Sequence, residues 1–373
     1  MRFSVEKSHL LNAVLTASRA TATKSLVPAL EGLLIEAAGG SVKISGYDLK
    51  TGITTSVPAD VVEEGKIVLN ARLLGEIVRK MQDDVVYISL SGNTMTTKIE
   101  CGPSEFEIIA TPAEDFPDLP TVDYQFSLVV TQKNLKSMIA QTNFAVSDNE
   151  SRPIHTGALF EAEKGMLTIV AVDGYRLALR REPLYEPETS PMSFVVPGTA
   201  LAEVERILSD SDEPVTVMLG LKHIMFVIGG TILTSRRLEG EFLNYKNSVP
   251  LTEKYEIEAD RKTLLEAVER VSLIISDKLK SPVRCTFSTN VIRLLASTEL
   301  GRASDECPVS GDGEDLEIGF NNRYLLDALR AAPADKIRLK ITSGVSPCVI
   351  VPADGKANFL YMILPVRLKA NEN

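Results

Sequence analysis

Three stretches of the chain share one order of apolar and polar residues, a short alternating run followed by apolar residues three and four positions apart. They occupy residues 3–18, 126–146 and 255–276. In the second stretch, Thr131 stands where the alternation gives way to helical spacing, so its side chain can cap a helix. Each stretch predicts a strand that runs into an amphipathic helix. Recurrence at near-equal intervals predicts a structural unit repeated three times.

A second pattern recurs in the other half of each repeat. Near Val68, Val196 and Phe320, the end of a strand is followed by a turn or cap and then by a second predicted helix. Acidic turn residues and an alternating strand come next, as at residues 85–90. Such alternation is typical of half-buried antiparallel strands. The predicted fold class is therefore α+β, with two helices per repeat packed on antiparallel sheets.

Two clusters of proline and acidic residues, at 111–122 and 239–253, separate the repeats. We therefore expect three similar domains at residues 1–124, 125–250 and 251–373. A chain of 373 residues is long enough for two or three domains.

Composition adds three expectations. Apolar residues make up 44% of the chain and aromatic residues only 6%, without tryptophan, so the cores must be largely aliphatic. The chain has no signal-like start and no apolar run of membrane-spanning length, so we expect a cytoplasmic protein with no membrane partner. The four cysteines form no C-x-x-C pair, so we expect buried free thiols rather than disulfides or zinc ligands.

Charge is distributed unevenly along the chain. The net charge is -10, but the six predicted helices with their adjoining loops sum to +7 and leave -17 for the strands and turns. One interpretation is that lysine and arginine are good helix formers on solvated faces. The other is a surface that faces phosphate groups. No aromatic residues interleave the basic ones, which disfavours base stacking on single strands. No zinc-finger or RNA-recognition motif occurs, so any contact with nucleic acid would be with its backbone and independent of its sequence.

Catalytic motifs are not found in the sequence. His9, His155 and His223 have no cysteine or aspartate at a diagnostic spacing, and neither G-x-x-x-x-G-K-[ST] nor G-x-G-x-x-G occurs. The acidic residues at 210–212 and 312–315 have the chemistry to bind a cation, but both groups fall at predicted turns, where acidic residues are routine. We expect no enzymatic activity, no cofactor and no metal.

Several longer sequence segments resemble those of a known family. They are the opening MRFSVEKSHLLNAV and the residues 46–48, 115–119, 172–177 and 364–368. With the threefold repeat, they make the chain resemble the bacterial sliding clamps, the beta subunit of DNA polymerase III, over essentially its whole length.

The resemblance implies three similar DNA-clamp domains per chain and a head-to-tail homodimer that closes into a ring. Such a ring encircles and slides on duplex DNA as a processivity factor for the polymerase. Its partners are the replicative polymerase, the clamp loader and other replication and repair proteins that carry a clamp-binding motif. Loading would require a separate ATP-using machine, because the chain has no nucleotide-binding loop.

The resemblance also assigns residues to DNA contact and to dimerisation. It implies DNA contact by Lys24, Asn149 and Arg152, and a dimer interface formed by Phe106 and Ile108 on one side and by Ile274 and Ile275 on the other. Charge and helix placement add four basic residues to the DNA-binding set: Arg72, Arg79, Lys80 and Arg206.

Finally, the resemblance implies a pocket between the second and third domains that takes a short peptide with an apolar end. The matching residues are His155, Val172, Gly174, Tyr175, Arg176, Leu177, Leu243, Asn247, Ser248, Ser346, Met362, Leu364, Pro365, Val366 and Arg367. Tyr175, Leu243, Asn247 and His155 depart from the commonest pattern of the family, and residues 369–373 extend past its usual end.

Two other classes of function stay open on the residues alone. One is a metal- or nucleotide-dependent hydrolase built on repeated β-rich domains, which requires a cluster of acidic and basic groups within one repeat. The other is an interaction scaffold that never meets DNA, which predicts no electrostatic preference for the helical face.

Overall fold

The computed structural model describes residues 1–91, 94–186, 190–250, 252–276, 281–355 and 358–368. The chain forms two compact units. The first comprises residues 1–133, 185–189 and 203–237, and the second comprises the remainder. Two of the boundaries between the units fall within helices, α3 (Gln132–Ala140) and α4 (Gly198–Ile207). The division into three domains at residues 124 and 250 stays a prediction.

The first unit contains two antiparallel sheets. In spatial order, the five-stranded sheet is β5 (Asp60–Glu63), β1 (Arg2–Glu6), β7 (Val85–Ser91), β8 (Thr96–Cys101) and β9 (Ser104–Ile109). The nine-stranded sheet is β10 (Thr111–Pro112), β6 (Gly65–Asn70), β2 (Gly32–Ala38), β3 (Ser41–Tyr47), β4 (Thr51–Pro58), β18 (Thr231–Arg236), β17 (His223–Ile228), β16 (Pro214–Gly220) and β11 (Tyr124–Thr131).

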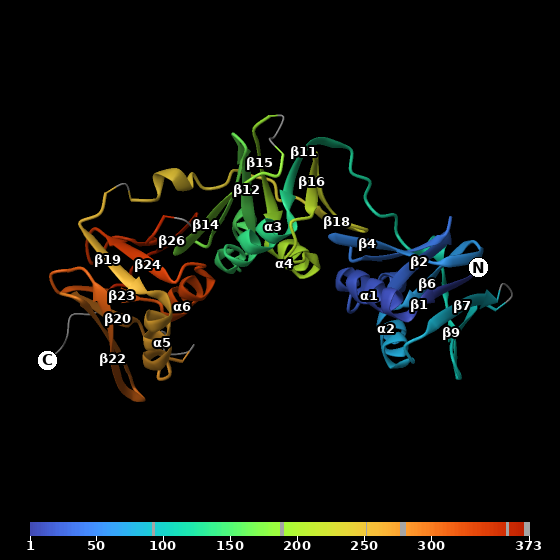
Figure 1. Ribbon diagram of the computed structural model, residues 1–373, viewed down its shortest axis with the longest axis horizontal. Coiled ribbons are helices and arrows are strands. Elements are labelled where there is room, and N and C mark those ends of the chain that lie inside the picture. Colours follow the sequence, from blue (N-terminus) through green and yellow to red (C-terminus); the bar gives the residue numbers. More distant parts are fainter. Residues whose placement is uncertain (92–93, 187–189, 251, 277–280, 356–357, 369–373) are drawn as a thin grey trace. The chain divides into compact units, whose positions relative to one another are not determined.

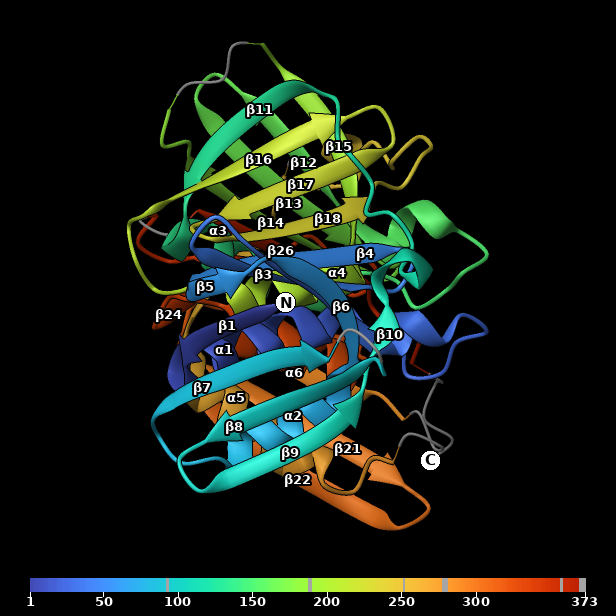
Figure 2. The ribbon, with the colours of Figure 1, turned by 90° about the vertical axis from the view of Figure 1, so that its right-hand side faces the viewer.

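The nine-stranded sheet joins the first repeat to the second. Strand β4 pairs with β18 from Thr55↔Thr231 to Thr51↔Ser235, and Figure 2 shows β11, β16, β17, β18 and β4 as successive strands. Helices α1 (Lys7–Ala17) and α2 (Ala71–Lys80) lie side by side in this unit (Figure 1). Their apolar faces, which include Leu10 and Leu74, share one buried core with strand residues such as Ile35. Burial of each such leucine contributes roughly 1.5–3 kcal/mol.

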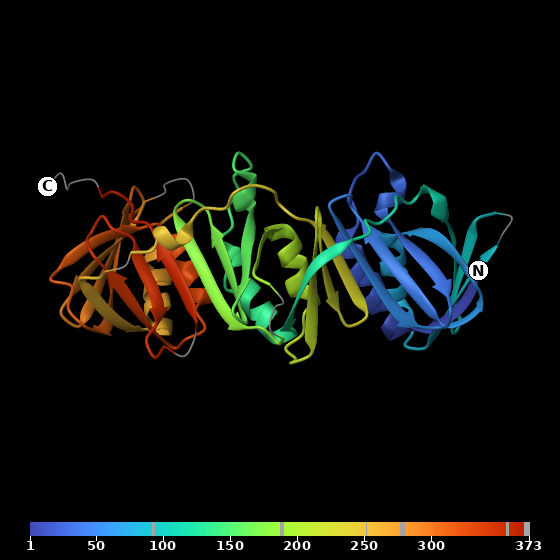
Figure 3. The same ribbon diagram turned by 90° about the horizontal axis from the view of Figure 1, so that it is seen from above.

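The second unit contains one antiparallel sheet of twelve strands. In spatial order they are β15 (Met192–Pro197), β12 (Gly157–Glu163), β13 (Met166–Val172), β14 (Arg176–Pro183), β26 (Phe359–Ile363), β25 (Cys348–Pro352), β24 (Lys336–Ile341), β19 (Tyr255–Asp260), β22 (Gly301–Ser310), β21 (Val291–Thr298), β20 (Val283–Ser288) and β23 (Leu316–Phe320). The pairing of β14 with β26 joins the second repeat to the third, and in Figure 3 a green strand runs beside red ones.

Helices α5 (Arg261–Ser272) and α6 (Asn322–Ala331) also lie side by side (Figure 1). Both begin at a side chain that caps the first turn. The Asp260 carboxylate accepts from the Thr263 backbone N–H at 2.8 Å, and Asn321 accepts from that of Arg323 at 3.0 Å. Each cap contributes about 1 kcal/mol to helix stability.

The prediction that the cysteines are buried free thiols is confirmed. All four cysteines are free and buried in the described part of the chain. Burial raises the pKa of Cys348 to about 12 and that of Cys307 to about 11. Among the described residues, no helix is long and apolar enough to cross a membrane.

Candidate functional site

The joint between β14 and β26 organises the predicted peptide-binding residues. Arg176 pairs with Ile363 and Leu177 with Met362 in this ladder. Because successive side chains leave a strand on opposite faces, Leu177 and Met362 share one face and Arg176 lies on the other. The predicted pocket residues are thereby separated into an apolar set and a polar set.

The apolar set forms a cluster within the second unit. Val172, Leu177 and Met362 are buried together with Tyr245, and the partly buried Phe242 packs against them. The sequence predicted the first three, but not Phe242 and Tyr245. Phe242 directly precedes the predicted Leu243, and Tyr245 lies between Leu243 and the predicted Asn247.

Three further predicted residues, His155, Leu243 and Ser248, lie near this cluster in the sequence or in space. The ring of His155 meets that of Phe242 edge to face, with centroids 5.6 Å apart. Burial and the charge of Arg152 lower the pKa of His155, which favours the neutral imidazole. Leu243 is exposed, and Ser248 ends the short helix η6 (Tyr245–Asn247) by donating its backbone N–H to Tyr245.

A tight turn at residues 173–175 precedes β14. Oδ1 of Asp173 accepts from the backbone N–H groups of Tyr175 and Arg176, at 2.9 and 3.0 Å. Gly174 has φ +94°, a conformation that L side chains rarely adopt. The turn projects Tyr175, which is 63% exposed and stacks on Tyr324 with a centroid distance of 6.4 Å.

Arg176 is buried and held from two sides. Its Nε donates to Oδ2 of Asp173 at 2.8 Å and its Nη1 to Oδ2 of Asp327 at 2.6 Å. Its guanidinium carbon lies 4.4 Å from the centroid of the Tyr324 ring, a cation–π distance. Sequence reasoning missed Tyr324 and Asp327. Their spacing of three on α6 places them on one helical face, but nothing in that spacing points to Arg176.

The end of the chain borders two cavities. One, of about 770 Å³, is lined by Glu317, Gly344, Val345 and residues 364–368, and so includes the predicted Leu364, Pro365, Val366 and Arg367. The other, of about 360 Å³, is lined by Ile275, Ser276, Ser281, Pro282, Val366 and residues 321–324.

Val366 lines both cavities, so they share a wall. Two backbone bonds fix this segment: Leu364 donates to Tyr175 at 2.9 Å and Val366 to Gly319 at 2.8 Å. The predicted Ser346 bonds the Ser343 hydroxyl at 2.7 Å, beside the loop that lines the larger cavity. The extension at 369–373 lies outside the described residues.

The predicted DNA-contacting side chains are all exposed. Lys24, Arg72, Arg79, Lys80 and Arg206 belong to the first unit, and Asn149 and Arg152 to the second. Arg72 and Arg206 each form an ion pair within their own helix, with Glu76 and Glu203. Such exposed pairs are weak and are easily exchanged for a phosphate contact.

The four predicted interface residues lie next to strongly exposed apolar neighbours. Phe106 and Ile108 are on β9, an edge strand of the five-stranded sheet, and the next residue, Ile109, is 83% exposed. Ile274 and Ile275 follow α5, directly after Leu273, which is 84% exposed. The sequence pattern did not single out Ile109 or Leu273.

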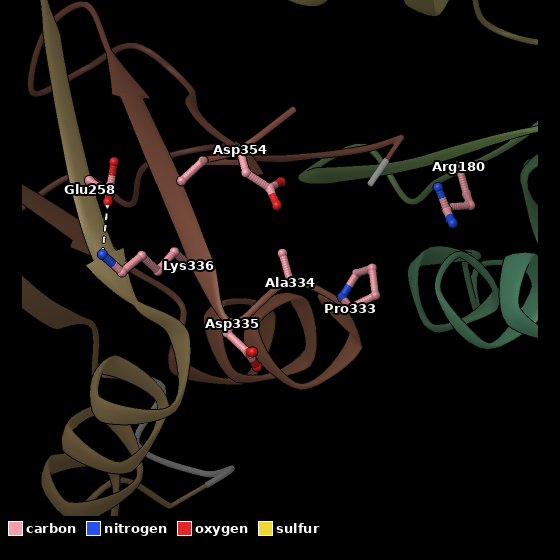
Figure 4. Close-up of a pocket in the computed structure, with 8 residues that line it drawn as sticks. Arg180, Glu258, Pro333, Ala334, Asp335, Lys336 and Asp354 are labelled. Atoms are coloured by element: carbon pink, nitrogen blue, oxygen red, sulfur yellow. Dashed lines mark hydrogen bonds and ion pairs between the residues drawn. The ribbon is translucent and has the colours of Figure 1, made fainter. Parts of the chain in front are cut away.

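A third cleft, of about 710 Å³, lies apart from the predicted residues (Figure 4). It is lined by Arg180, Glu258, Ala353, Asp354 and residues 333–336, with Glu258 and Lys336 paired at 3.4 Å. This lining holds no serine, cysteine or histidine. The described residues also contain no group of three side chains suited to hold a metal ion.

Comparison with known proteins decides the family. Family models of the DNA polymerase III beta subunit match residues 1–120 (N-terminal domain), 129–244 (central domain) and 246–367 (C-terminal domain). The chain belongs to this family of beta sliding clamps. It is 31% identical to the beta sliding clamps of Halalkalibacterium halodurans and Bacillus subtilis, over 98% of this chain and 100% of each relative.

Solved clamp structures agree with the fold. The Bacillus subtilis DNA polymerase sliding clamp matches with a TM-score of 0.94 and 30% identity, over 99% of this chain and 100% of that one. A Pseudomonas aeruginosa sliding clamp bound to griselimycin matches with a TM-score of 0.93 and 27% identity, over the same shares.

These comparisons confirm the resemblance and the fold class. Sliding clamps are non-catalytic processivity factors of DNA replication, a family that binds DNA and polymerase. The hydrolase that the residues alone left open is therefore wrong.

Proposed function

We propose that the chain forms a head-to-tail homodimeric ring in the cytoplasm that encircles duplex DNA. Through the site around the β14–β26 joint, the ring tethers the replicative polymerase, the clamp loader and other proteins with a clamp-binding motif. The three domains of the proposal are residues 1–124, 125–250 and 251–373. The observation that carries it is the apolar cluster of Leu177 and Met362, bordered by a chain end that lines two cavities.

The peptide site combines features suited to a short apolar-ended segment. The cluster around Leu177 is buried and supports the site from beneath its strands' surface, so the apolar area open to a peptide comes from the exposed ring of Tyr175 and the side chain of Val366. Apolar contact contributes roughly 25 cal/mol per Å² buried. Backbone groups near the chain end can fix the orientation of the peptide, as is usual where apolar grooves bind peptides. His155, Gly174, Leu243, Asn247, Ser248 and Ser346 complete the proposed set.

Contact with DNA is proposed for seven exposed side chains. They are Lys24, Arg72, Arg79, Lys80, Asn149, Arg152 and Arg206. A ring held by topology requires little affinity, and tight contacts would stall it on the duplex. A few screened phosphate contacts therefore suit sliding better than a strongly basic protein would. A net charge of -10 is compatible with this mechanism.

Closure of the ring is proposed to pair β9 of one chain with β22 of its partner. In the described part of the chain, β9 pairs only with β8. Strand β22 pairs with β21 along one side, and on its other side it pairs with β19 only at Val309 and Ser310. Both strands thus offer unpaired backbone groups along one edge, a liability that a second chain would remove. The proposed apolar contacts join Phe106 and Ile108 to Ile274 and Ile275.

Light scattering coupled to size exclusion tests this assembly. We expect a single species with twice the mass of the chain, independent of loading concentration over the micromolar range. A species with the mass of one chain would contradict the proposed ring.

A further inference from the structure

The inference concerns the side of β14 that carries Arg176. Leu177 packs with Met362 in the apolar cluster, whereas Arg176, on the opposite face, lies over the ring of Tyr324. The guanidinium of Arg176 therefore lies on the side of β14 that contacts α6. The contacts on that side determine how Arg176 contributes to the peptide site.

On that face the guanidinium is shared between two carboxylates from distant parts of the chain. Asp173 lies in the turn before β14, and Asp327 lies on α6. Arg176 is only 8% exposed. A cation so far removed from water depends on both carboxylates, because losing either one leaves its charge poorly compensated in a medium of low dielectric constant.

The network continues from Asp173 to the cavity wall. The same carboxylate that pairs with Arg176 also accepts from the backbone N–H of Tyr175 at 2.9 Å. The carbonyl of Tyr175 accepts in turn from the backbone N–H of Leu364 at 2.9 Å, and Leu364 lines the larger cavity. Asp327 is thus linked to the cavity wall through an unbroken series of hydrogen-bonded residues.

We propose that Asp327 is a positioning residue of the peptide site, an inference that rests on the proposed function. Its carboxylate fixes Arg176 and, through Asp173, the turn that places Tyr175 against Leu364. Tyr324, one helical turn before Asp327, adds a second restraint because it stacks with both Arg176 and Tyr175. Helix α6 is therefore the support for a site whose binding surface comes largely from β14 and the end of the chain.

Substitution of Asp327 by asparagine tests the proposal, because it keeps the shape and removes the charge. We expect Asp327→Asn to weaken binding of a short fluorescein-labelled peptide ending in Leu-Phe by about tenfold, measured by fluorescence anisotropy. The matched control is Glu269→Gln, which neutralises a carboxylate of α5 that pairs at 2.7 Å with Arg330, a residue of α6 like Asp327. The control should bind the peptide as the wild type does.

Two further measurements separate positioning from general stability. In an Arg176→Ala background, Asp327→Asn should change the affinity by less than about twofold, because the pair is already broken. Asp327→Glu keeps the negative charge, so it should recover part of the affinity that Asp327→Asn loses. A lowered midpoint of thermal unfolding with wild-type affinity in Asp327→Asn would overturn the proposal.

A different result is expected if the proposed peptide site itself is wrong. The wild-type protein would then not bind the peptide, or Val366→Asp would bind it as tightly as the wild type. If Val366→Asp loses binding while Asp327→Asn binds normally, only the role of Asp327 is overturned.

Discussion

The guanidinium of Arg176 and the carboxylate of Asp327 lie 2.6 Å apart, although 151 positions separate them in the chain. This pair fixes helix α6 of the third repeat to strand β14 of the second. It stands beside the β14–β26 ladder, so side-chain and backbone contacts hold the same joint from different directions.

Removing this arginine should be costly for stability. Arg176→Ala would leave Asp173 and Asp327 without their common partner, and we expect the free energy of unfolding to fall by about 3 kcal/mol. Urea denaturation followed by circular dichroism measures the change. The control is Arg293→Ala, which breaks an exposed pair with Glu306 and should cost under about 1 kcal/mol. Equal losses in the two variants would contradict the prediction.

Val366 offers a test of the peptide site at little cost in stability. It is 38% exposed and lines both cavities, so Val366→Asp places a charge where an apolar side chain of the peptide would lie. We expect peptide affinity to fall at least about tenfold, since a carboxylate must be desolvated on binding. Titration calorimetry gives the constant. Val62→Asp, on the exposed face of β5, should bind normally; a loss there would point to a global effect.

Dimerisation should depend on two exposed side chains that the sequence did not flag. Leu273→Asp and Ile109→Asp would each put a charge into the proposed interface and leave the folded chain intact, because both side chains are mostly exposed. We expect the dissociation constant of the dimer, measured by sedimentation equilibrium, to rise about 100-fold or more. Leu221→Asp, also strongly exposed, is the control. An unchanged constant in both test variants would place the interface elsewhere.

The cap of α5 predicts a pH dependence. Hydrogen bonds from Thr263 lower the pKa of Asp260 below its ordinary value of 3.8, since they favour the carboxylate. The stabilisation is therefore present above the unfolded-state pKa and is lost as pH falls through the lower folded-state value. Asp260→Asn keeps a capping oxygen without a titrating group, so the acid-induced loss of stability should be smaller than in the wild type. Thermal unfolding between pH 2 and pH 6 measures it, and parallel curves would refute the prediction.

Local pattern was sufficient for the elements but not for their distant contacts. Helical spacing predicted the helix that begins at Gln132, and alternation predicted strands such as β7. No local pattern reports that Asp327 faces Arg176, because the two share no periodicity and meet only through the fold. The exposure of Ile109 could not be predicted from the local sequence either. It depends on which strands pair with β9, and that is decided by the order of the strands in the whole sheet.

The division into three domains, which the repeats predict, stays a prediction beside the two compact units of the structure. The sheets continue from one repeat to the next, at β4–β18 and at β14–β26. No local pattern predicts these pairings, because each joins strands that are far apart in the sequence.

The most direct test of the proposed ring compares its retention on two forms of one DNA. The protein is loaded onto a nicked circular plasmid by a clamp loader, and half of the sample is then linearised at a single site. We predict that the protein stays on the circle through gel filtration and leaves the linear form by sliding off its ends. Equal loss from both forms would contradict a topological link to DNA.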